Sequence, residues 1–143
     1  MWQSSPAQRP QSASIEKKTI LVVEDSPTQA AQIRALLVAN GLQVQLACDG
    51  IEGLEKAVET QPALIILDLE MPRMNGVETA RALKANLLTR KIPLILFTRH
   101  ELTEAKALGL DEEIADFIPK DAFAKVVMIE TLKQMGIIRG AAE

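Results

Sequence analysis

The chain is poor in cysteine, histidine and aromatic residues: among 143 residues it has one cysteine, one histidine, one tryptophan and no tyrosine. A lone Cys48 cannot form an internal disulfide and leaves no Cys/His pattern for zinc, so we expect a reducing compartment, the cytoplasm. No apolar run approaches the roughly eighteen residues of a membrane span, and no signal peptide is evident at the start. Neither membrane association nor export is predicted.

The chain also has no excess of positive charge. Its formal net charge is -3 and its pI is near 5.3, which makes direct binding to nucleic acid a poor expectation. Hydrophobic residues make up 48% and charged residues 24%, which fits one globular domain with a real core. Residues 1–16 are rich in Ser, Gln and Pro and are expected to be a flexible tail, followed by the domain at 17–138 and a short tail at 139–143.

Short apolar runs alternate with longer segments of helical period along the domain. The expected strands are 19–23, 42–47, 63–67, 93–97 and 116–119, and the expected helices follow them, the fourth at 101–108 and the fifth at 122–135. The strands are too uniformly apolar to be half exposed, as in a parallel sheet covered on both faces. The pattern predicts an α/β fold, a doubly wound five-stranded parallel sheet built from five βα units.

Local signals place the ends and the inner faces of the helices. Ser26 and Asp49 are expected N-caps of the first two helices, with Pro27 at the first helical position. The residues expected to face the core are Ala30, Ile33, Leu36 and Leu37 in the first helix, Ile51, Leu54 and Val58 in the second, and Val77, Ala80 and Leu83 in the third. Cys48 is expected to be packed, and Gly76 to supply a backbone conformation that other residues resist.

Four of the expected strands end in a polar side chain: Glu24 and Asp25, then Asp68, Thr98 and Lys120. Carboxyl ends of parallel strands meet at one edge, where open α/β sheets bind ligands. Carboxylates held close together repel unless they are protonated or share a cation, and hard oxygen ligands suit Mg²⁺. With an ammonium and a hydroxyl beside them, these groups could hold a phosphoryl group while Asp68, on the central strand, attacks it.

The segments ILVVEDSPTQA, LIILDLEMPRMNG, LILFT and DFIPKDAF resemble, in order and spacing, the receiver domain of two-component response regulators over about residues 18–135. The resemblance implies a flavodoxin-like, CheY-like fold and a phosphoryl group accepted on Asp68 from a histidine kinase or phosphotransfer protein. It further implies Mg²⁺ ligands from Asp25, Asp68 and the main-chain carbonyl of Glu70, with Glu24 acting largely through metal-bound water.

The resemblance also assigns the remaining roles. Thr98 would contact the phosphoryl oxygen and, with Phe117, form the switch, while Lys120 would pair with the phosphoryl group. We expect a single-domain signalling receiver that catalyses only its own aspartyl phosphorylation and dephosphorylation. It would signal to a protein partner, or to a second copy of itself, through the surface made by the fourth helix, fifth strand and fifth helix.

Three features depart from the family pattern. Arg99 stands where receivers usually carry a small residue, Asp121 rather than proline follows Lys120, and the connection at 107–116 is long. A cis bond before a non-proline residue would cost about 3 kcal/mol, so the Lys120–Asp121 bond is expected to be trans or strained. Glu70, Arg99 and His100 would gate water and small phosphodonors at Asp68, predicting slow hydrolysis and poor labelling by acetyl phosphate.

Two rival functions are left open by the residues. Arg99 and the missing proline could mark a degenerate receiver that serves as a docking scaffold without phosphorylation, although a scaffold needs none of the five polar residues. A phosphatase of the haloacid dehalogenase type also uses Asp, Thr and Lys with Mg²⁺, but it places its nucleophile after the first strand. Flavin binding is not favoured, because EDSPTQ is not a phosphate loop rich in glycine and hydroxyl groups.

Overall fold

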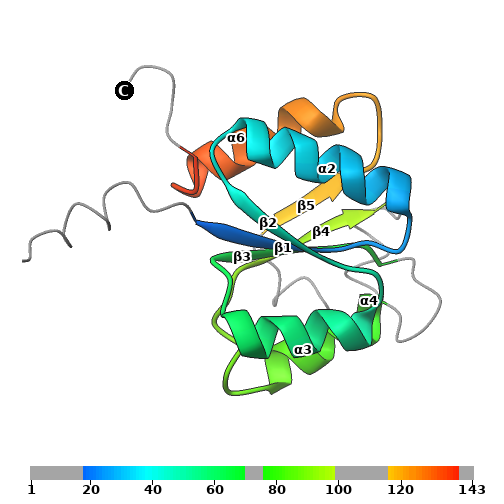
Figure 1. The fold of residues 1–143 in the computed structure, drawn as a ribbon, viewed down its shortest axis with the longest axis vertical. Helices are drawn as coiled ribbons and strands as arrows, with labels where there is room; N and C mark the ends of the chain where they lie inside the picture. The colour runs from blue at the N-terminus through cyan, green and yellow to red at the C-terminus, as the bar shows by residue number, and fades with distance from the viewer. Residues whose placement is uncertain (1–17, 70–75, 99–115, 139–143) are drawn as a thin grey trace, which may run out of the picture.

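The computed structural model describes residues 18–69, 76–98 and 116–138. Its elements are β1 (Thr19–Val23), α2 (Pro27–Ala39), β2 (Gln43–Ala47), α3 (Gly50–Thr60), β3 (Leu64–Leu67), α4 (Gly76–Ala85), β4 (Leu94–Thr98), β5 (Asp116–Pro119) and α6 (Ala124–Gln134). The strands form one parallel sheet in the order β2-β1-β3-β4-β5 (Figure 1). This order confirms the predicted doubly wound α/β fold.

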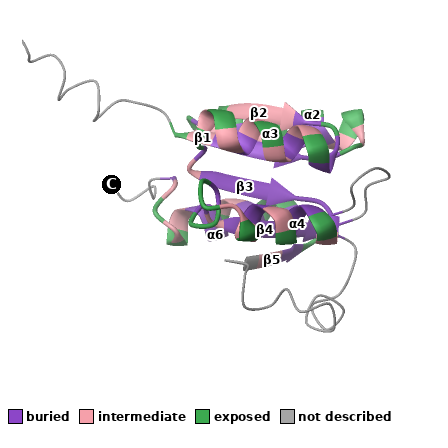
Figure 2. Cartoon of the chain, turned by 90° about the horizontal axis from the view of Figure 1, so that it is seen from below, coloured by how far each residue is buried: buried purple, intermediate pink, exposed green. Residues whose placement is uncertain are grey.

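Helices cover both faces of the sheet, with α2 and α6 on one side and α3 and α4 on the other (Figure 1). Successive strand residues point to opposite faces. Leu21 and Val23 of β1 therefore join the core under α3 and α4, whereas Ile20 and Val22 join the core under α2 and α6. Figure 2 shows β3 buried along its length, as expected for a central strand whose residues are all apolar.

Helix α2 begins as the sequence predicts. The Ser26 hydroxyl accepts a hydrogen bond from the Gln29 N–H at 3.3 Å, and Pro27 occupies the first turn. Ala30, Ile33 and Leu37 are buried as expected, and Leu36 is half-buried. Among the described residues no helix is long and apolar enough to cross a membrane.

The predicted inner face of α3 is confirmed for Leu54, which is half-buried against the core, and is wrong for Ile51. Asp49 does cap the helix, accepting from the Glu52 N–H at 2.9 Å, but Ile51 is 44% exposed. The buried residues of α3 are Gly50, Gly53 and Ala57, and a Cβ added at Gly53 would lie 2.9 Å from a methyl group of Val23. Because α3 packs this closely on β1, only small residues fit against the strand, and larger side chains are displaced to the flanks of the helix.

Other expectations need smaller corrections. Cys48 is exposed rather than packed, because it follows the end of the edge strand β2. The last helix begins at Ala124 instead of 122, and the second strand begins at Gln43 instead of 42. The fourth helix expected at 101–108, the long connection through residue 115 and the two tails lie outside the described residues.

Candidate functional site

The backbone brings the polar strand ends together at the carboxyl edge of the sheet. Beyond the strand ends, the Asp68 N–H donates to the Val23 carbonyl at 3.1 Å, the Glu24 N–H to that of Ala47 at 2.9 Å and the Lys120 N–H to that of Thr98 at 2.9 Å. These bonds extend the sheet ladder by one residue. The residues that follow neighbouring strands are thereby held side by side, as the sequence predicted.

Lys120 joins two of the predicted carboxylates. Its Nζ lies 3.0 Å from Glu24 Oε1 and 3.0 Å from Asp68 Oδ2. The side chains of Glu24 and Asp68 are buried, and that of Lys120 is only 8% exposed. Lys120 Nζ also lies 5.4 Å from the centre of the Phe97 ring, within cation–π range. Phe97 was not predicted to lie at the site, because a contact between a ring on β4 and the residue after β5 depends on side-chain packing.

The buried charges alter the acidity of Glu24. Burial away from water, and then the nearby negative charge of Asp68, raise the pKa of Glu24 to about 7. The ammonium of Lys120 and the Ser26 N–H, which donates to Glu24 Oε2 at 3.3 Å, act in the opposite direction without cancelling the rise. Near neutral pH, Glu24 therefore takes up or releases a proton readily unless a cation holds it ionised.

Three carboxylates can converge on one metal ion at this edge. One oxygen each from Glu24, Asp25 and Asp68 can be chosen so that all lie within 4.8 Å of one another. Asp25 is exposed, and a cavity of about 570 Å³ opens over Glu24 and Asp25, so the cluster is accessible to ions. Hard carboxylate oxygens beside a solvent opening, where water can complete the coordination shell, fit Mg²⁺.

Gly76 is required for a reason that the sequence did not reveal. Its φ is not in the left-handed region, since the positive-φ glycines of the described chain are Gly41 and Gly136. A Cβ at Gly76 would lie 2.2 Å from Leu69 Cα and 2.4 Å from the Asp68 carbonyl oxygen. The start of α4 thus rests directly on the backbone that carries Asp68, and only glycine allows this approach.

Thr98 and Phe117 lie on neighbouring strands. Thr98 is buried at the end of β4, while Phe117 pairs with Leu96 in the sheet register and is half-buried against the core under α3 and α4. The Lys120–Asp121 bond is trans, one of the two alternatives expected. Glu70, Arg99 and His100, the expected carbonyl ligand and gating residues, lie outside the described residues.

The fold and this site define an α/β protein of the two-component signalling class, with an acidic cluster and a lysine at the carboxyl edge of the sheet. Residues 20–133 match the family model of the response regulator receiver domain. The chain belongs to this family, as its sequence motifs predicted.

Curated relatives and solved structures agree with this assignment. The response regulator MprA of Mycobacterium ulcerans (strain Agy99) is 35% identical over 101 residues, which make up 71% of this chain but 43% of MprA. The receiver domain of a signal transduction histidine kinase from Syntrophus aciditrophicus is 34% identical, with a TM-score of 0.74 over 88% of this chain and 96% of that one. This chain therefore matches less than half the length of the curated relative.

A third similar protein bears on the metal. The receiver domain of sensor histidine kinase PA1611 from Pseudomonas aeruginosa PAO1 is 27% identical, with a TM-score of 0.74 over 82% of this chain and 96% of that one. Its structure has a magnesium ion coordinated in the active site cleft.

Proposed function

We propose that this receiver is switched by phosphorylation of Asp68, with a histidine kinase or a phosphotransfer protein as phosphodonor. The observation that carries the proposal is the position of Lys120 Nζ, 3.0 Å from Asp68 Oδ2 at an edge that also holds Glu24 and Asp25. A carboxylate nucleophile with a cation beside it can hold a phosphoryl group as its charge redistributes during transfer.

The residues divide the work of the transfer. An Asp68 carboxylate oxygen attacks phosphorus, and the bond to the leaving group breaks with its electron pair. The Lys120 ammonium pairs with one phosphoryl oxygen, and the Thr98 hydroxyl donates a hydrogen bond to another. Mg²⁺, held by Asp25 and Asp68 with Glu24 acting through bound water, would neutralise phosphoryl charge when bound. The chain would catalyse only its own phosphorylation and dephosphorylation.

The surface beside β5 is the proposed output. Helix α6 exposes Phe123 at its start, 71% exposed, and Val126 in its first turn, 65% exposed. Binding of the Thr98 hydroxyl to the phosphoryl group would draw the end of β4 toward Asp68. This movement would bias the side chain of Phe117 on β5 toward the interior. The two states differ in what α6 and β5 present, and a protein partner or a second copy that prefers one state would detect the change.

Labelling with a small phosphodonor tests the proposal. The chain is incubated with phosphoramidate and Mg²⁺, and intact mass spectrometry measures addition of one phosphoryl group. We expect labelling of the wild-type chain and of Asp121→Asn, a matched exposed carboxylate, but not of Asp68→Asn. Chelation of Mg²⁺ should abolish labelling. Equal labelling of Asp68→Asn, or no labelling of the wild type, would contradict the proposal.

A phosphorylation-independent docking scaffold is the second candidate, and the exposed apolar residues of α6 are compatible with it as well as with a switched receiver. The buried group of Glu24, Asp68 and Lys120 argues for the first proposal, since burying charges is costly and a scaffold gains nothing from them. A scaffold would bind its partner equally well with Asp68→Asn, whereas a switched receiver would lose the effect of phosphodonor on binding.

A further inference from the structure

Phe97 and Lys120 lie on the same face of the sheet at its carboxyl edge. Phe97 pairs with Ile118 in the register of β4 and β5, and both belong to the core under α2 and α6. Lys120 follows Ile118 by two positions, and its N–H donates to the Thr98 carbonyl, so the alternation of strand side chains directs it to this same face. The ring of the buried Phe97 thereby comes within 5.4 Å of Lys120 Nζ, measured from the ring centre.

The ring contact differs in kind from the other two contacts of the ammonium. Glu24 Oε1 and Asp68 Oδ2 each lie 3.0 Å from Lys120 Nζ and hold it by opposite charge. Both carboxylates also belong to the cluster that fits Mg²⁺, and Asp68 is the proposed phosphoryl acceptor. Metal binding therefore draws on the same negative charge that holds Lys120, whereas the neutral ring of Phe97 keeps its attraction for the ammonium.

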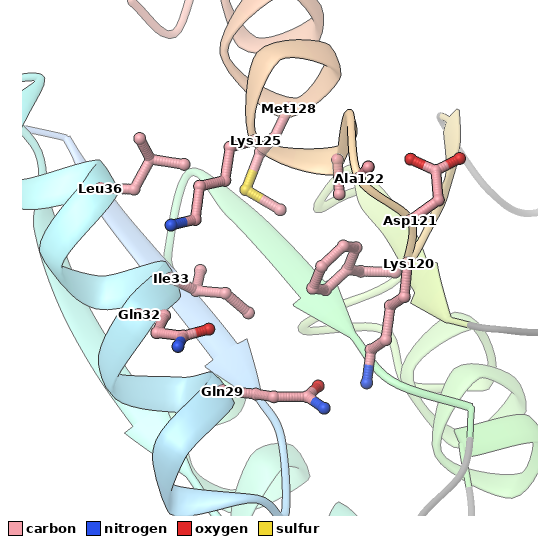
Figure 3. A pocket seen from close by; sticks show the side chains of 11 residues that line it. Gln29, Gln32, Ile33, Leu36, Lys120, Asp121, Ala122, Lys125 and Met128 are labelled. Carbon is pink, nitrogen blue, oxygen red and sulfur yellow. The ribbon is translucent and has the colours of Figure 1, made fainter.

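An ammonium released from the carboxylates has room to leave the edge. A cavity of about 440 Å³ opens between α2 and the start of α6, and Phe97, Lys120 and Met128 are among the residues that line it (Figure 3). In Figure 3 the Lys120 side chain extends along this opening, across from Gln29 of α2. Because the lysine stem is flexible and its ammonium is strongly hydrated, the ammonium can exchange the carboxylates for water in the cavity unless another group retains it.

We infer that Phe97 is a positioning residue: its ring retains the Lys120 ammonium at the carboxyl edge when the carboxylates bind Mg²⁺, so that the ammonium is in place for the phosphoryl group on Asp68. The inference rests on the proposed function and gives a part in it to a buried aromatic residue with no reactive group. Because the Lys120 side chain is only 8% exposed, the attraction should favour the retained ammonium over the released one by about tenfold.

Retention of the ammonium has opposite effects on metal binding and on phosphoryl transfer. Two cations at one edge repel each other, so a ring that keeps Lys120 in place opposes the binding of Mg²⁺. Weakening the ring's attraction destabilises the metal-free state, in which the ammonium is held, at least as much as the metal-bound state, from which it can leave. The affinity for Mg²⁺ should then stay equal or increase while labelling of Asp68 slows. A ring that only fills space would, when altered, loosen the site and weaken both.

The test replaces Phe97 in the full chain by phenylalanines with one, two and three fluorine atoms on the ring, which withdraw electron density from the ring face with little change in shape. Intact mass spectrometry follows labelling of Asp68 by phosphoramidate at saturating Mg²⁺, and calorimetry measures the affinity for Mg²⁺. We expect the labelling rate to fall stepwise, by about fivefold with three fluorine atoms, at equal or tighter Mg²⁺ binding. Met128→Leu, a volume-conserving change in the buried lining of the same cavity, is the control, and both quantities should stay within about twofold of wild type.

The two measurements separate the possible failures. A labelling rate within about twofold across the fluorinated series, or a fall in rate accompanied by weaker Mg²⁺ binding, would overturn the inference and leave the proposed function standing. An equal fall in rate in Met128→Leu would also overturn it, because the effect would then come from packing around the cavity. Absence of labelling in the wild-type chain would overturn the proposed function and this inference with it. All variants are compared at a temperature at which thermal unfolding shows them to be folded.

Discussion

Lys120 Nζ lies 3.0 Å from Asp68 Oδ2, although the two residues are 52 positions apart in the chain. The same ammonium is 3.0 Å from Glu24 Oε1, so one cation is shared by two buried carboxylates. This contact ties three strands together, because its members directly follow the last residues of β1, β3 and β5. Stability, metal binding and phosphorylation should therefore all depend on Lys120.

Removing the ammonium should destabilise the metal-free chain strongly. Lys120→Met leaves two carboxylates buried without a counter-charge, and we expect a loss of about 3–5 kcal/mol in the free energy of unfolding, measured by urea denaturation with chelator present. Lys133→Met is the control, since Lys133 pairs with Glu130 at 3.7 Å on the surface and should change stability by less than about 1 kcal/mol. Equal losses in both variants would show that the buried ion pairs of Lys120 contribute no more to the free energy of unfolding than the surface pair of Lys133 does.

The raised pKa of Glu24 predicts a pH dependence of stability. The pKa of Glu24 is about 7 in the folded chain against an ordinary value of 4.5, so the folded state binds its proton more tightly than the unfolded state does. Ionising Glu24 therefore costs folding free energy, and stability falls as pH rises from about 4.5 through about 7. The loss is on the order of 3 kcal/mol above pH 7 without metal.

Glu24→Gln checks this dependence, because glutamine mimics the protonated acid. With chelator present, the melting temperature of the variant relative to wild type should rise between pH 5 and pH 8. Added Mg²⁺ should favour the ionised acid and narrow the gap at pH 8. A difference between variant and wild type that stays constant over this pH range would refute the assigned pKa.

Metal affinity should depend on the exposed carboxylate at the end of β1. Asp25→Asn removes one negative oxygen from the cluster of Glu24, Asp25 and Asp68, and we expect the affinity for Mg²⁺ to fall at least about tenfold by isothermal titration calorimetry. Asp121→Asn, which changes an exposed carboxylate outside the cluster, should leave the affinity unchanged. Unaltered binding in Asp25→Asn would remove Asp25 from the site.

A methyl group at Gly76 should reduce the phosphorylation of Asp68 more than its effect on folding stability explains. It would lie 2.2 Å from Leu69 Cα, so the backbone after Asp68 must move, at a cost of about 1–3 kcal/mol in stability. We expect Gly76→Ala to lose most labelling of Asp68 by phosphoramidate. Gly41→Ala is the control, because its φ of +86° makes alanine strained by about 1 kcal/mol, yet its Cβ meets no atom within 4 Å. A comparable loss of labelling there would attribute the effect to stability.

Beryllofluoride, a mimic of the aspartyl phosphate, should shift the proposed output surface. In the presence of Mg²⁺ we expect amide chemical-shift changes at Thr98 and Phe117 and along α6, measured by NMR. Asp68→Asn should show none of them. Changes confined to the immediate neighbours of Asp68, with α6 unmoved, would contradict the switch.

The sequence predicted the parts of the site that follow from strand order. Apolar runs buried on both faces identify a parallel sheet, and polar residues directly after them must meet at its carboxyl edge. Glu24, Asp25, Asp68, Thr98 and Lys120 were therefore recognisable without coordinates. The caps at Ser26 and Asp49 were equally accessible, because the bonds from a cap to the first helical turn join residues three apart.

Distances between segments far apart in the chain were decided only by the tertiary structure. The close packing of Gly53 on Val23 places small residues against β1 and leaves Ile51 exposed. The contact of Gly76 with Leu69 replaces a conformational explanation with a steric one. The tertiary structure also decided that Lys120 is shared between two carboxylates and that the buried Oε1 of Gln29 has no hydrogen-bond donor among the described residues. Residue type sets what a side chain can bond to, but the packing of helices on the sheet sets which partners come within reach.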